Sequence, residues 1–481
     1  MEIKFGGILK CMAASLAAWA LGANLAYAQS QSQRDMHLEA ATRNTGGDSF
    51  LKDWTRDRYC MYVDNPALLA QIRTQRAPLP LMQIFDDVWF VGFQNVGQFI
   101  VKNPNGFTLI DTLNSGADVD NYTYPALKSL GLDSSASLLG AYITHGHFDH
   151  DGGADRLRAI FGPNFPIYLG SGDIAGKTYA PIPLDSDNLG YQSFSLGGRQ
   201  MTVLSSPGHT PGTMSAIFPV RDNGIERNLL VVGGTAIPMN ISASRSYLRS
   251  VERMYQAVRD FNAVGTLHPH GIIDGGNQHM EQIARQKTRV ANPYIIGNEK
   301  LLRTVAIMRE CGAAQVAQVD STAKEPVWRV TSLAFDAQSP STSRMAASLR
   351  SDWGPVPDQE VVFRLKTSGA MCTAMTDSNG LATCGSRFTV QPKDEVTVSF
   401  AGKANGDYVD LPAMRTAHVS NLQCDIDSNG SVDRRDISAI MLGINRPIVA
   451  GDPLDADGDG KVTINDARTC TQKCSKEQCA S

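Results

Sequence analysis

The chain has 481 residues, of which 42% are hydrophobic and 19% are charged, and its formal net charge is −4. This length exceeds what one ordinary core supports, so we expect roughly two to four domains. The composition excludes global disorder. The small net charge gives no indication of a nucleic-acid partner or an anionic-membrane partner.

The first 28 residues have the pattern of an export signal. Lys4 and Lys10 are basic, an apolar run extends from Cys11 to Leu25, and Ala26-Tyr27-Ala28 fits the small-x-small cleavage rule. We therefore predict an exported protein, periplasmic or secreted, with a retained membrane anchor as the alternative. Residues 29–79 are interpreted as a leader segment, which is polar and loose up to about residue 50.

Eight cysteines follow the predicted signal, and an even number in an exported protein favours disulfides. Cys372 and Cys384 flank a turn and predict a bridge across a hairpin. Four cysteines in the last 60 residues predict a small stapled module. The eight are Cys60, Cys311, Cys372, Cys384, Cys424, Cys470, Cys474 and Cys479.

Residues 80–320 alternate between short β-rich runs and helical patterns in two similar halves. This order predicts two sheets packed on each other with helices outside, an α/β architecture. The expected strands are 88–91, 99–101, 107–111, 138–144, 200–204, 215–220 and 229–232. The expected helices are 124–130, 153–161, 246–262, 277–290 and 298–314.

The composition changes near residue 320. Between 326 and 418, Val361–Leu365 and Val396–Phe400 alternate as strands do, and the turns are polar, which predicts a small β-sandwich. The stretch Thr376–Ala382 resembles a hairpin of bacterial immunoglobulin-like repeats.

Metal-ligand side chains gather directly after the expected strand 138–144. His145, His147, Asp149 and His150 lie within six residues, and so many imidazoles beside a carboxylate are costly to bury without a partner. Both side-chain types bind zinc well. Further candidates follow later segments: His209 in the loop 206–212, and the pair His268 and His270 after a short apolar run.

This combination of H-x-H-x-D-H, P-G-H-T-P-G and a late H-P resembles the metallo-β-lactamase superfamily over residues 80–315, and most closely its third subclass of zinc β-lactamases. The resemblance implies an αββα sandwich with two zinc ions at one edge. The first ion would be held by His145, His147 and His209. The second would be held by Asp149, His150 and His268, because the His-Pro form favours His268 over His270.

The resemblance also implies an activity. A metal-bound hydroxide, oriented by the catalytic residue Asp149, would open an amide or ester bond of a small acyl substrate, most simply a β-lactam. A lactonase, esterase or thioesterase of the same fold is the alternative, and a catalytically silent surface-attached binding protein is the second. Many superfamily members have a metal-bridging Asp where this chain has Val231–Ala236, and that departure favours the β-lactamases over glyoxalase-type thioesterases.

Two acidic segments near the C-terminus share the register of a calcium loop, with oxygen ligands at positions 1, 3, 5 and 12 and a backbone carbonyl at position 7. Residues 421–481 resemble a dockerin module, with helices expected at 437–443 and 467–473. This implies two calcium ions and either a cohesin-like or surface partner or calcium-dependent stabilisation alone. The implied ligands are Asp425, Asp427, Asn429, Ser431 and Asp436 in the first loop, and Asp455, Asp457, Asp459, Lys461 and Asp466 in the second.

Overall fold

The computed structural model describes residues 33–133, 137–286, 291–336, 339–340, 345–384, 394–419, 424–427, 431–446, 452–474 and 479. The predicted export signal lies outside the described residues. The chain divides into two compact units, Met1–Val327 and Trp328–Ser481. None of the described helices combines the length and the apolar composition needed to span a bilayer.

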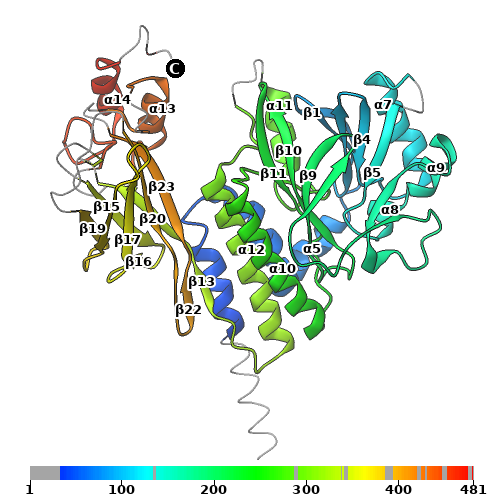
Figure 1. Cartoon of the computed structure of the whole chain (residues 1–481), viewed down its shortest axis with the longest axis horizontal. Helices are drawn as coiled ribbons and strands as arrows, with labels where there is room; N and C mark the ends of the chain where they lie inside the picture. Colours follow the sequence, from blue (N-terminus) through cyan, green and yellow to red (C-terminus); the bar gives the residue numbers. More distant parts are fainter. Residues whose placement is uncertain are drawn as a thin grey trace, which may run out of the picture. The chain divides into compact units, whose positions relative to one another are not determined.

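The first unit contains two sheets that share one core (Figure 1). Strands β1 to β4 are antiparallel, and β4 to β7 are parallel. This sheet consists of β1 (Pro78–Phe85), β2 (Val88–Phe93), β3 (Gly97–Asn103), β4 (Gly106–Ile110), β5 (Leu138–Tyr142), β6 (Ile167–Gly170) and β7 (Ile182–Leu184).

The second sheet has the order β12-β11-β10-β9-β8 and is antiparallel except for the β11–β12 pair. Its strands are β8 (Gln192–Leu196), β9 (Arg199–Ser205), β10 (Met214–Asp222), β11 (Ile225–Val231) and β12 (Thr266–Leu267). Phe99 and Tyr142 from the first sheet share a buried cluster with Val203 and Phe218 from the second. The hydrophobic core between the sheets is therefore the layer that holds the sandwich together.

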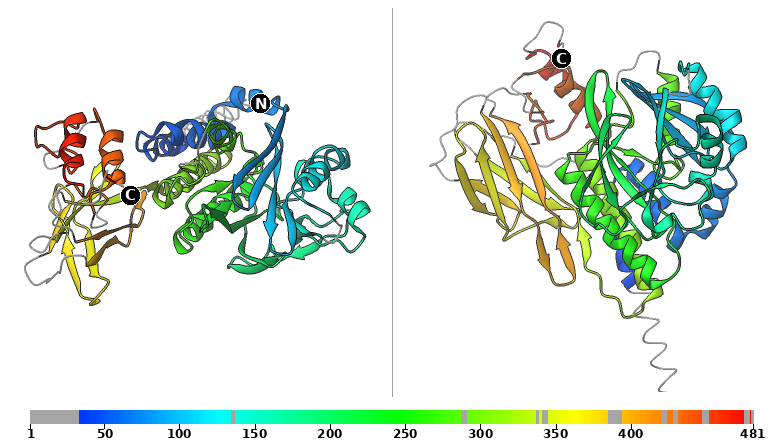
Figure 2. Two further views of the ribbon diagram at one scale, coloured as in Figure 1. Left: turned by 90° about the horizontal axis from the view of Figure 1, so that it is seen from above. Right: turned by 45° about the vertical axis from the view of Figure 1, so that its right-hand side comes forward.

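Helices cover the outer faces of the sandwich. Leu127 and Leu157 pack with Leu109 on the outer face of the first sheet, and α10 and α12 lie side by side (Figures 1 and 2). The predicted αββα arrangement is confirmed. The helices are α6 (Gly116–Asp118), η2 (Val119–Thr123), α7 (Tyr124–Ser129), α8 (Phe148–Asp151), α9 (Ala154–Phe161), η4 (Ser171–Asp173), α10 (Ile241–Asp260), α11 (Gly276–Arg285) and α12 (Asn298–Val319).

The periodicity predicted for 246–262 is present in α10, where Tyr247, Val251, Met254 and Val258 are all buried. The helix begins earlier than predicted, because the side chain of Asn240 accepts a hydrogen bond from the backbone N–H of Ala243. An asparagine in this position satisfies one of the free donors at a helix start.

The described part of residues 29–79 differs from the loose leader expected there, because it is largely helical from 33 to 73. Cys60 forms a disulfide with Cys311 of α12, and His37 contacts Glu310 at 2.7 Å with both side chains buried. These contacts link distant parts of the chain, so no local pattern predicts them. The elements are a helix at 33–43, α2 (Ser49–Leu51), η1 (Lys52–Arg56), α3 (Asp57–Tyr59), α4 (Met61–Asp64) and α5 (Pro66–Arg73).

The second unit is rich in β-structure, as predicted, and contains a separate helical part. Phe363 and Val398 of one four-stranded sheet share a core with Leu333 and Leu349 of another. The strands are β13 (Val327–Arg329), β14 (Thr331–Phe335), β15 (Met345–Ser351), β16 (Gly354–Pro355), β17 (Glu360–Leu365), β18 (Met371–Met375), β19 (Leu381–Cys384), β20 (Glu395–Phe400), β21 (Lys403–Asn405), β22 (Tyr408–Asp410) and β23 (Ala413–His418).

Helices α13 (Arg434–Leu442) and α14 (Ile464–Thr471) pack around a small core of their own. The hairpin bridge Cys372–Cys384 is present as predicted, and the C-terminal cysteines pair as Cys424–Cys470 and Cys474–Cys479. Because the small core around α13 and α14 buries few side chains, we expect the bridges Cys424–Cys470 and Cys474–Cys479 to contribute much of the stability of this C-terminal module.

Candidate metal centre

The predicted metal-ligand residues come together where several strands of the first unit end. His145 and His147 follow β5, and Asp149 and His150 lie on the short helix α8 that His147 begins. His209 lies in the loop between β9 and β10. Strands of both sheets therefore deliver ligands to the same edge of the sandwich.

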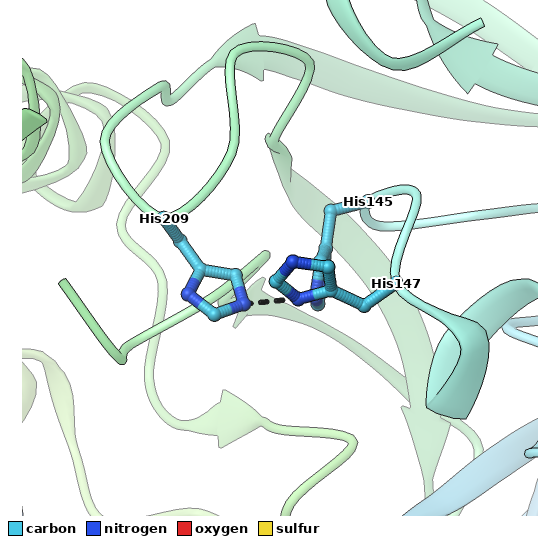
Figure 3. A group of neighbouring side chains, drawn as sticks. All are labelled: His145, His147 and His209. Atoms are coloured by element: carbon cyan, nitrogen blue, oxygen red, sulfur yellow. Dashed lines mark hydrogen bonds between the residues drawn. The ribbon is translucent and has the colours of Figure 1, made fainter. Parts of the chain in front are cut away.

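The first side-chain group consists of His145, His147 and His209 (Figure 3). Nε2 of His145 lies 3.2 Å from Nδ1 of His147 and 3.0 Å from Nε2 of His209. Two nitrogens bound to one tetrahedral zinc ion at about 2.0–2.1 Å lie about 3.3 Å apart. These two nitrogen–nitrogen distances are therefore close to those of a zinc ligand set.

The second group consists of Asp149, His150 and His270. Nε2 of His150 lies 3.1 Å from Nε2 of His270, and each of these nitrogens lies 3.7 Å from Oδ2 of Asp149. The two imidazoles and the carboxylate converge on one point, a donor set that suits zinc and several other divalent metals.

The structure differs from the preference for His268 over His270, because it groups His270 with Asp149 and His150. His268 is buried, and its Nδ1 accepts a hydrogen bond from the backbone N–H of His270, while its Nε2 has no hydrogen-bond partner in the described part of the chain. The chain turns at Pro269, so the side chains of His268 and His270 occupy different places. Only His270 reaches Asp149 and His150.

In three of these histidines, Nδ1 is hydrogen-bonded to an oxygen acceptor that belongs to neither group. Nδ1 of His150 lies 2.7 Å from Oδ2 of Asp111, Nδ1 of His270 lies 2.5 Å from the carbonyl of Asn95, and Nδ1 of His209 contacts the carbonyl of Ala236. A carboxylate or carbonyl oxygen only accepts, so each Nδ1 carries the proton. In the neutral ring, Nε2 then presents its lone pair inward, as metal ligation requires.

Burial favours these neutral rings. It lowers the pKa of His209 to about 4 and that of His270 to about 4, and it holds the pKa of His145 well below its ordinary value, aided by repulsion from the neighbouring histidines. For His150, burial acts in the same direction, but attraction to Asp111 outweighs it and the pKa is raised. At His145, His209 and His270, the lowered pKa therefore leaves a nitrogen lone pair free of a proton, which fits a bound cation.

Two close approaches of the backbone support this geometry and explain why glycine occupies them. A Cβ at Gly152 would lie 2.1 Å from the carbonyl oxygen of Asn114, so glycine lets α8 reach the segment after β4 that carries Asp111. A Cβ at Gly234 would lie 2.5 Å from Cδ2 of His209. The segment Val231–Ala236 therefore passes close beside His209 without contributing a carboxylate.

Asp173 joins the two loops that carry the first group, and no local sequence pattern identifies it as part of the site. Its carboxylate accepts hydrogen bonds from the backbone N–H of Gly146 at 2.8 Å and of Gly212 at 2.8 Å, and from the hydroxyl of Thr210 at 2.6 Å. Asp111, directly after β4, is also part of the surroundings of the site, and its buried carboxylate lies against His150.

The calcium candidates divide into two matching groups in the second unit. Asp425, Asp427 and Asp436 bring carboxylate oxygens together, as do Asp455, Asp457 and Asp466, at loop positions 1, 3 and 12 in both cases. Asn429 lies outside the described residues. Asp459 belongs to neither group, and it accepts a hydrogen bond from the backbone N–H of Lys461. Ser431 and Lys461 are predicted to ligate through their backbone carbonyls, which these side-chain groups do not test.

Comparison with known proteins agrees with this fold. Residues 91–222 match the family model of the metallo-beta-lactamase superfamily. A hydroxyacylglutathione hydrolase of Shewanella halifaxensis is 27% identical over 187 residues, which cover 38% of this chain and 59% of that protein. A probable metallo-hydrolase of Bacillus subtilis is 29% identical over 158 residues, which cover 30% of this chain and 70% of that protein. The match thus spans less than two thirds of the Shewanella protein.

Among solved structures, a subclass B3 metallo-beta-lactamase of Bradyrhizobium japonicum is similar, with 19% identity, a TM-score of 0.39, and coverage of 49% of this chain and 93% of that one. A metallo-beta-lactamase of Cronobacter sakazakii has 22% identity, a TM-score of 0.40, and coverage of 50% and 95%. The family-model match lies within the first unit.

Proposed function

We propose that the protein is a zinc-dependent hydrolase that opens the amide bond of a β-lactam or a closely related acyl bond. The observation that carries the proposal is the presence of two groups of metal-ligand side chains in the first unit. In three of their histidines, Nδ1 is hydrogen-bonded to Asp111, Ala236 or Asn95, which leaves Nε2 to bind a metal. His145, His147 and His209 would hold one zinc ion. Asp149, His150 and His270 would hold the second.

Zinc bound at such a site lowers the pKa of water and polarises a carbonyl oxygen. Hydrolysis joins the water oxygen to the acyl carbon and breaks the bond from that carbon to nitrogen, oxygen or sulfur. One water proton goes to the leaving atom and the other to solvent. Asp149 lines the pocket over the site, where its carboxylate can accept a hydrogen bond from the attacking water and orient it.

A thioester or ester substrate is the second candidate, and one observation favours it. The relatives named above include a hydroxyacylglutathione hydrolase. The absence of a carboxylate in Val231–Ala236, where many superfamily hydrolases have a bridging Asp, supports the β-lactam proposal instead. The third candidate, a catalytically silent binding protein, predicts bound metal without turnover of any of these substrates.

The test is hydrolysis of a chromogenic cephalosporin by zinc-loaded protein, with and without a chelator. Chelator-sensitive turnover that is lost in His147→Ala supports the β-lactamase proposal. No turnover by protein shown to carry about two zinc ions per chain overturns it. Thioester, lactone and aryl-ester substrates are then tested in the same way. Turnover of any of them supports the thioester or ester hydrolase, and turnover of none supports the catalytically silent binding protein.

We also propose that the C-terminal module binds two calcium ions. The two loops have the same arrangement: Asp436 accepts hydrogen bonds from the backbone N–H of Asp427 and Asp433, and Asp466 accepts them from Asp457 and Thr463. Oδ1 of Asp455 is buried without a hydrogen-bond partner in the described residues, as expected of an oxygen that ligates a cation.

Calorimetric titration tests this proposal. We expect about two calcium ions per chain and about one in Asp457→Ala. Two ions in the variant, or no heat with either protein, would contradict it.

We propose an exported protein with an immunoglobulin-like β-sandwich and a dockerin-like module. Recovery from the periplasm or medium with Gln29 as the first residue supports export. Binding of a cohesin domain in calcium but not in chelator supports a cohesin-like partner, whereas a calcium-dependent rise in Tm without such binding supports stabilisation alone.

A further inference from the structure

The pocket over the candidate metal centre has one wall from the N-terminal helical segment, which includes α4 and α5. It has a volume of about 290 Å³. His147, Asp149, His209 and His270 lie on one side. The other lining residues are Met61, Tyr62, Leu69, Ile72, Arg76, Asn95, Gly234, Thr235, Ala236, Ile272 and Ile273.

Arg76 is the only lysine or arginine among these lining residues, all of which belong to the described part of the chain. Its side chain makes no hydrogen bond or ion pair with any described residue. A guanidinium stays charged at all ordinary pH values, and covering it with an uncharged substrate removes water without replacing it. An anionic group on the substrate avoids that cost.

The backbone around Arg76 is held in place and connects to the metal centre. The N–H of Gln75 donates to the carbonyl of Ile72, and the N–H of Gln94 donates to the carbonyl of Ala77. The residue after Gln94 is Asn95, whose carbonyl accepts the hydrogen bond from His270. Arg76 therefore belongs to a segment that is anchored beside the site.

The neighbouring wall is apolar. Met61 and Ile72 are buried, Leu69 is half-buried, and Ile272 and Ile273 line the pocket from the segment after β12. This wall offers a surface for an apolar group of the substrate, since burying hydrocarbon against it releases water.

We propose that Arg76 determines substrate specificity by pairing with a carboxylate of the substrate, while an apolar part of the same substrate packs against Met61, Leu69 and Ile72. A single guanidinium matches a monoanion, and its two parallel N–H groups match a carboxylate. The substrate class is therefore a carboxylate-bearing acyl compound with a hydrophobic portion. The inference rests on the proposed hydrolase function.

The experiment compares two probes built on the same diacid chain: mono-4-nitrophenyl suberate, which carries a free carboxylate, and 4-nitrophenyl methyl suberate, in which a methyl ester makes that end neutral. Zinc-loaded wild type, Arg76→Gln, Arg76→Lys and Arg156→Gln are assayed. Arg156 is the matched control, an exposed arginine of α9 that does not line the pocket. We expect Arg76→Gln to lower the ratio of kcat/KM for the anionic probe to that for the neutral probe by about 10-fold, mainly through KM.

Arg76→Lys should retain part of the preference, and Arg156→Gln should retain all of it. An unchanged ratio in Arg76→Gln overturns the inference while leaving the hydrolase proposal intact. If neither probe is hydrolysed, calorimetric binding of monomethyl suberate and dimethyl suberate tests the pairing of Arg76 with a carboxylate. Weaker binding of the anion alone in Arg76→Gln supports the pairing, and equal binding by wild type and variant overturns it.

Discussion

His150 donates its Nδ1–H to Oδ2 of Asp111 across 2.7 Å, and both side chains are buried. The Asp111 carboxylate also accepts hydrogen bonds from the backbone N–H of Thr144 at 2.7 Å and from its hydroxyl at 3.0 Å. One buried carboxylate at the end of β4 thus fixes the start of the loop that carries His145 and also the tautomer of His150. An acceptor behind a metal-binding histidine has both effects.

Asp111→Asn should therefore weaken zinc binding by about 10–100-fold, because the amide is uncharged and has a single acceptor oxygen for three donors. Competition with a chromogenic chelator measures the change. Asp87→Asn is the control, since Asp87 pairs with Arg199 at 2.6 Å and lines no part of the pocket. Equal losses in the two variants would mean that Asp111 supports the fold and not the metal centre in particular.

Replacing each of the two late histidines separates the ligand from its neighbour. His270→Ala should lower the zinc content from about two ions per chain to about one, because it removes a nitrogen from the second group. His268→Ala should retain both ions and lower the free energy of unfolding by about 1–3 kcal/mol, because it empties a buried position. Metal analysis and urea unfolding give the two readouts. If His268→Ala lost one zinc ion and His270→Ala retained both, His268 would be the ligand and His270 its neighbour.

Asp173→Ala should loosen the first group, although Asp173 is not one of its members. Loss of the carboxylate leaves the N–H groups of Gly146 and Gly212 without their acceptor, so the two histidine-bearing loops are no longer joined. We expect about 10-fold weaker zinc binding, judged from the usual effect of groups that support metal ligands. Thr210→Val removes only one of the three hydrogen bonds and should have a smaller effect. Unaltered zinc affinity in Asp173→Ala would contradict this role.

Asp274 gives a pH-dependent contribution to stability. Burial raises its pKa from 3.8 to about 7 in the folded protein. Between these two values the folded protein holds a proton that the unfolded chain has released, so stability falls as the pH rises from about 4 to about 7. The full effect is on the order of 4 kcal/mol.

Asp274→Asn should remove that slope. Urea unfolding at pH 5 and pH 8, with a chelator present to eliminate metal linkage, measures the difference. Wild type should lose more stability than the variant over this range. Parallel profiles would show that the Asp274 carboxyl ionises alike in the folded and unfolded states.

Local residue patterns predicted the features that depend on near neighbours along the chain. His145, His147, Asp149 and His150 lie in one turn after a buried strand, so their spacing alone brings them to one edge. The apolar period of α10 and the alternation in β20 likewise follow from local geometry. The hairpin bridge Cys372–Cys384 joins residues 12 apart, close enough for a turn to pair them.

Features that depend on which distant segments pack together were visible only in the folded chain. The choice of His270 over His268 follows from the turn at Pro269 and from the carbonyl of Asn95, which is 175 residues away from His270 in the chain. The Cys60–Cys311 bridge spans 251 residues, and it ties the segment that brings Arg76 to the pocket against α12. Such contacts arise because burial selects partners by shape and position in the folded core, and local residue patterns do not encode that selection.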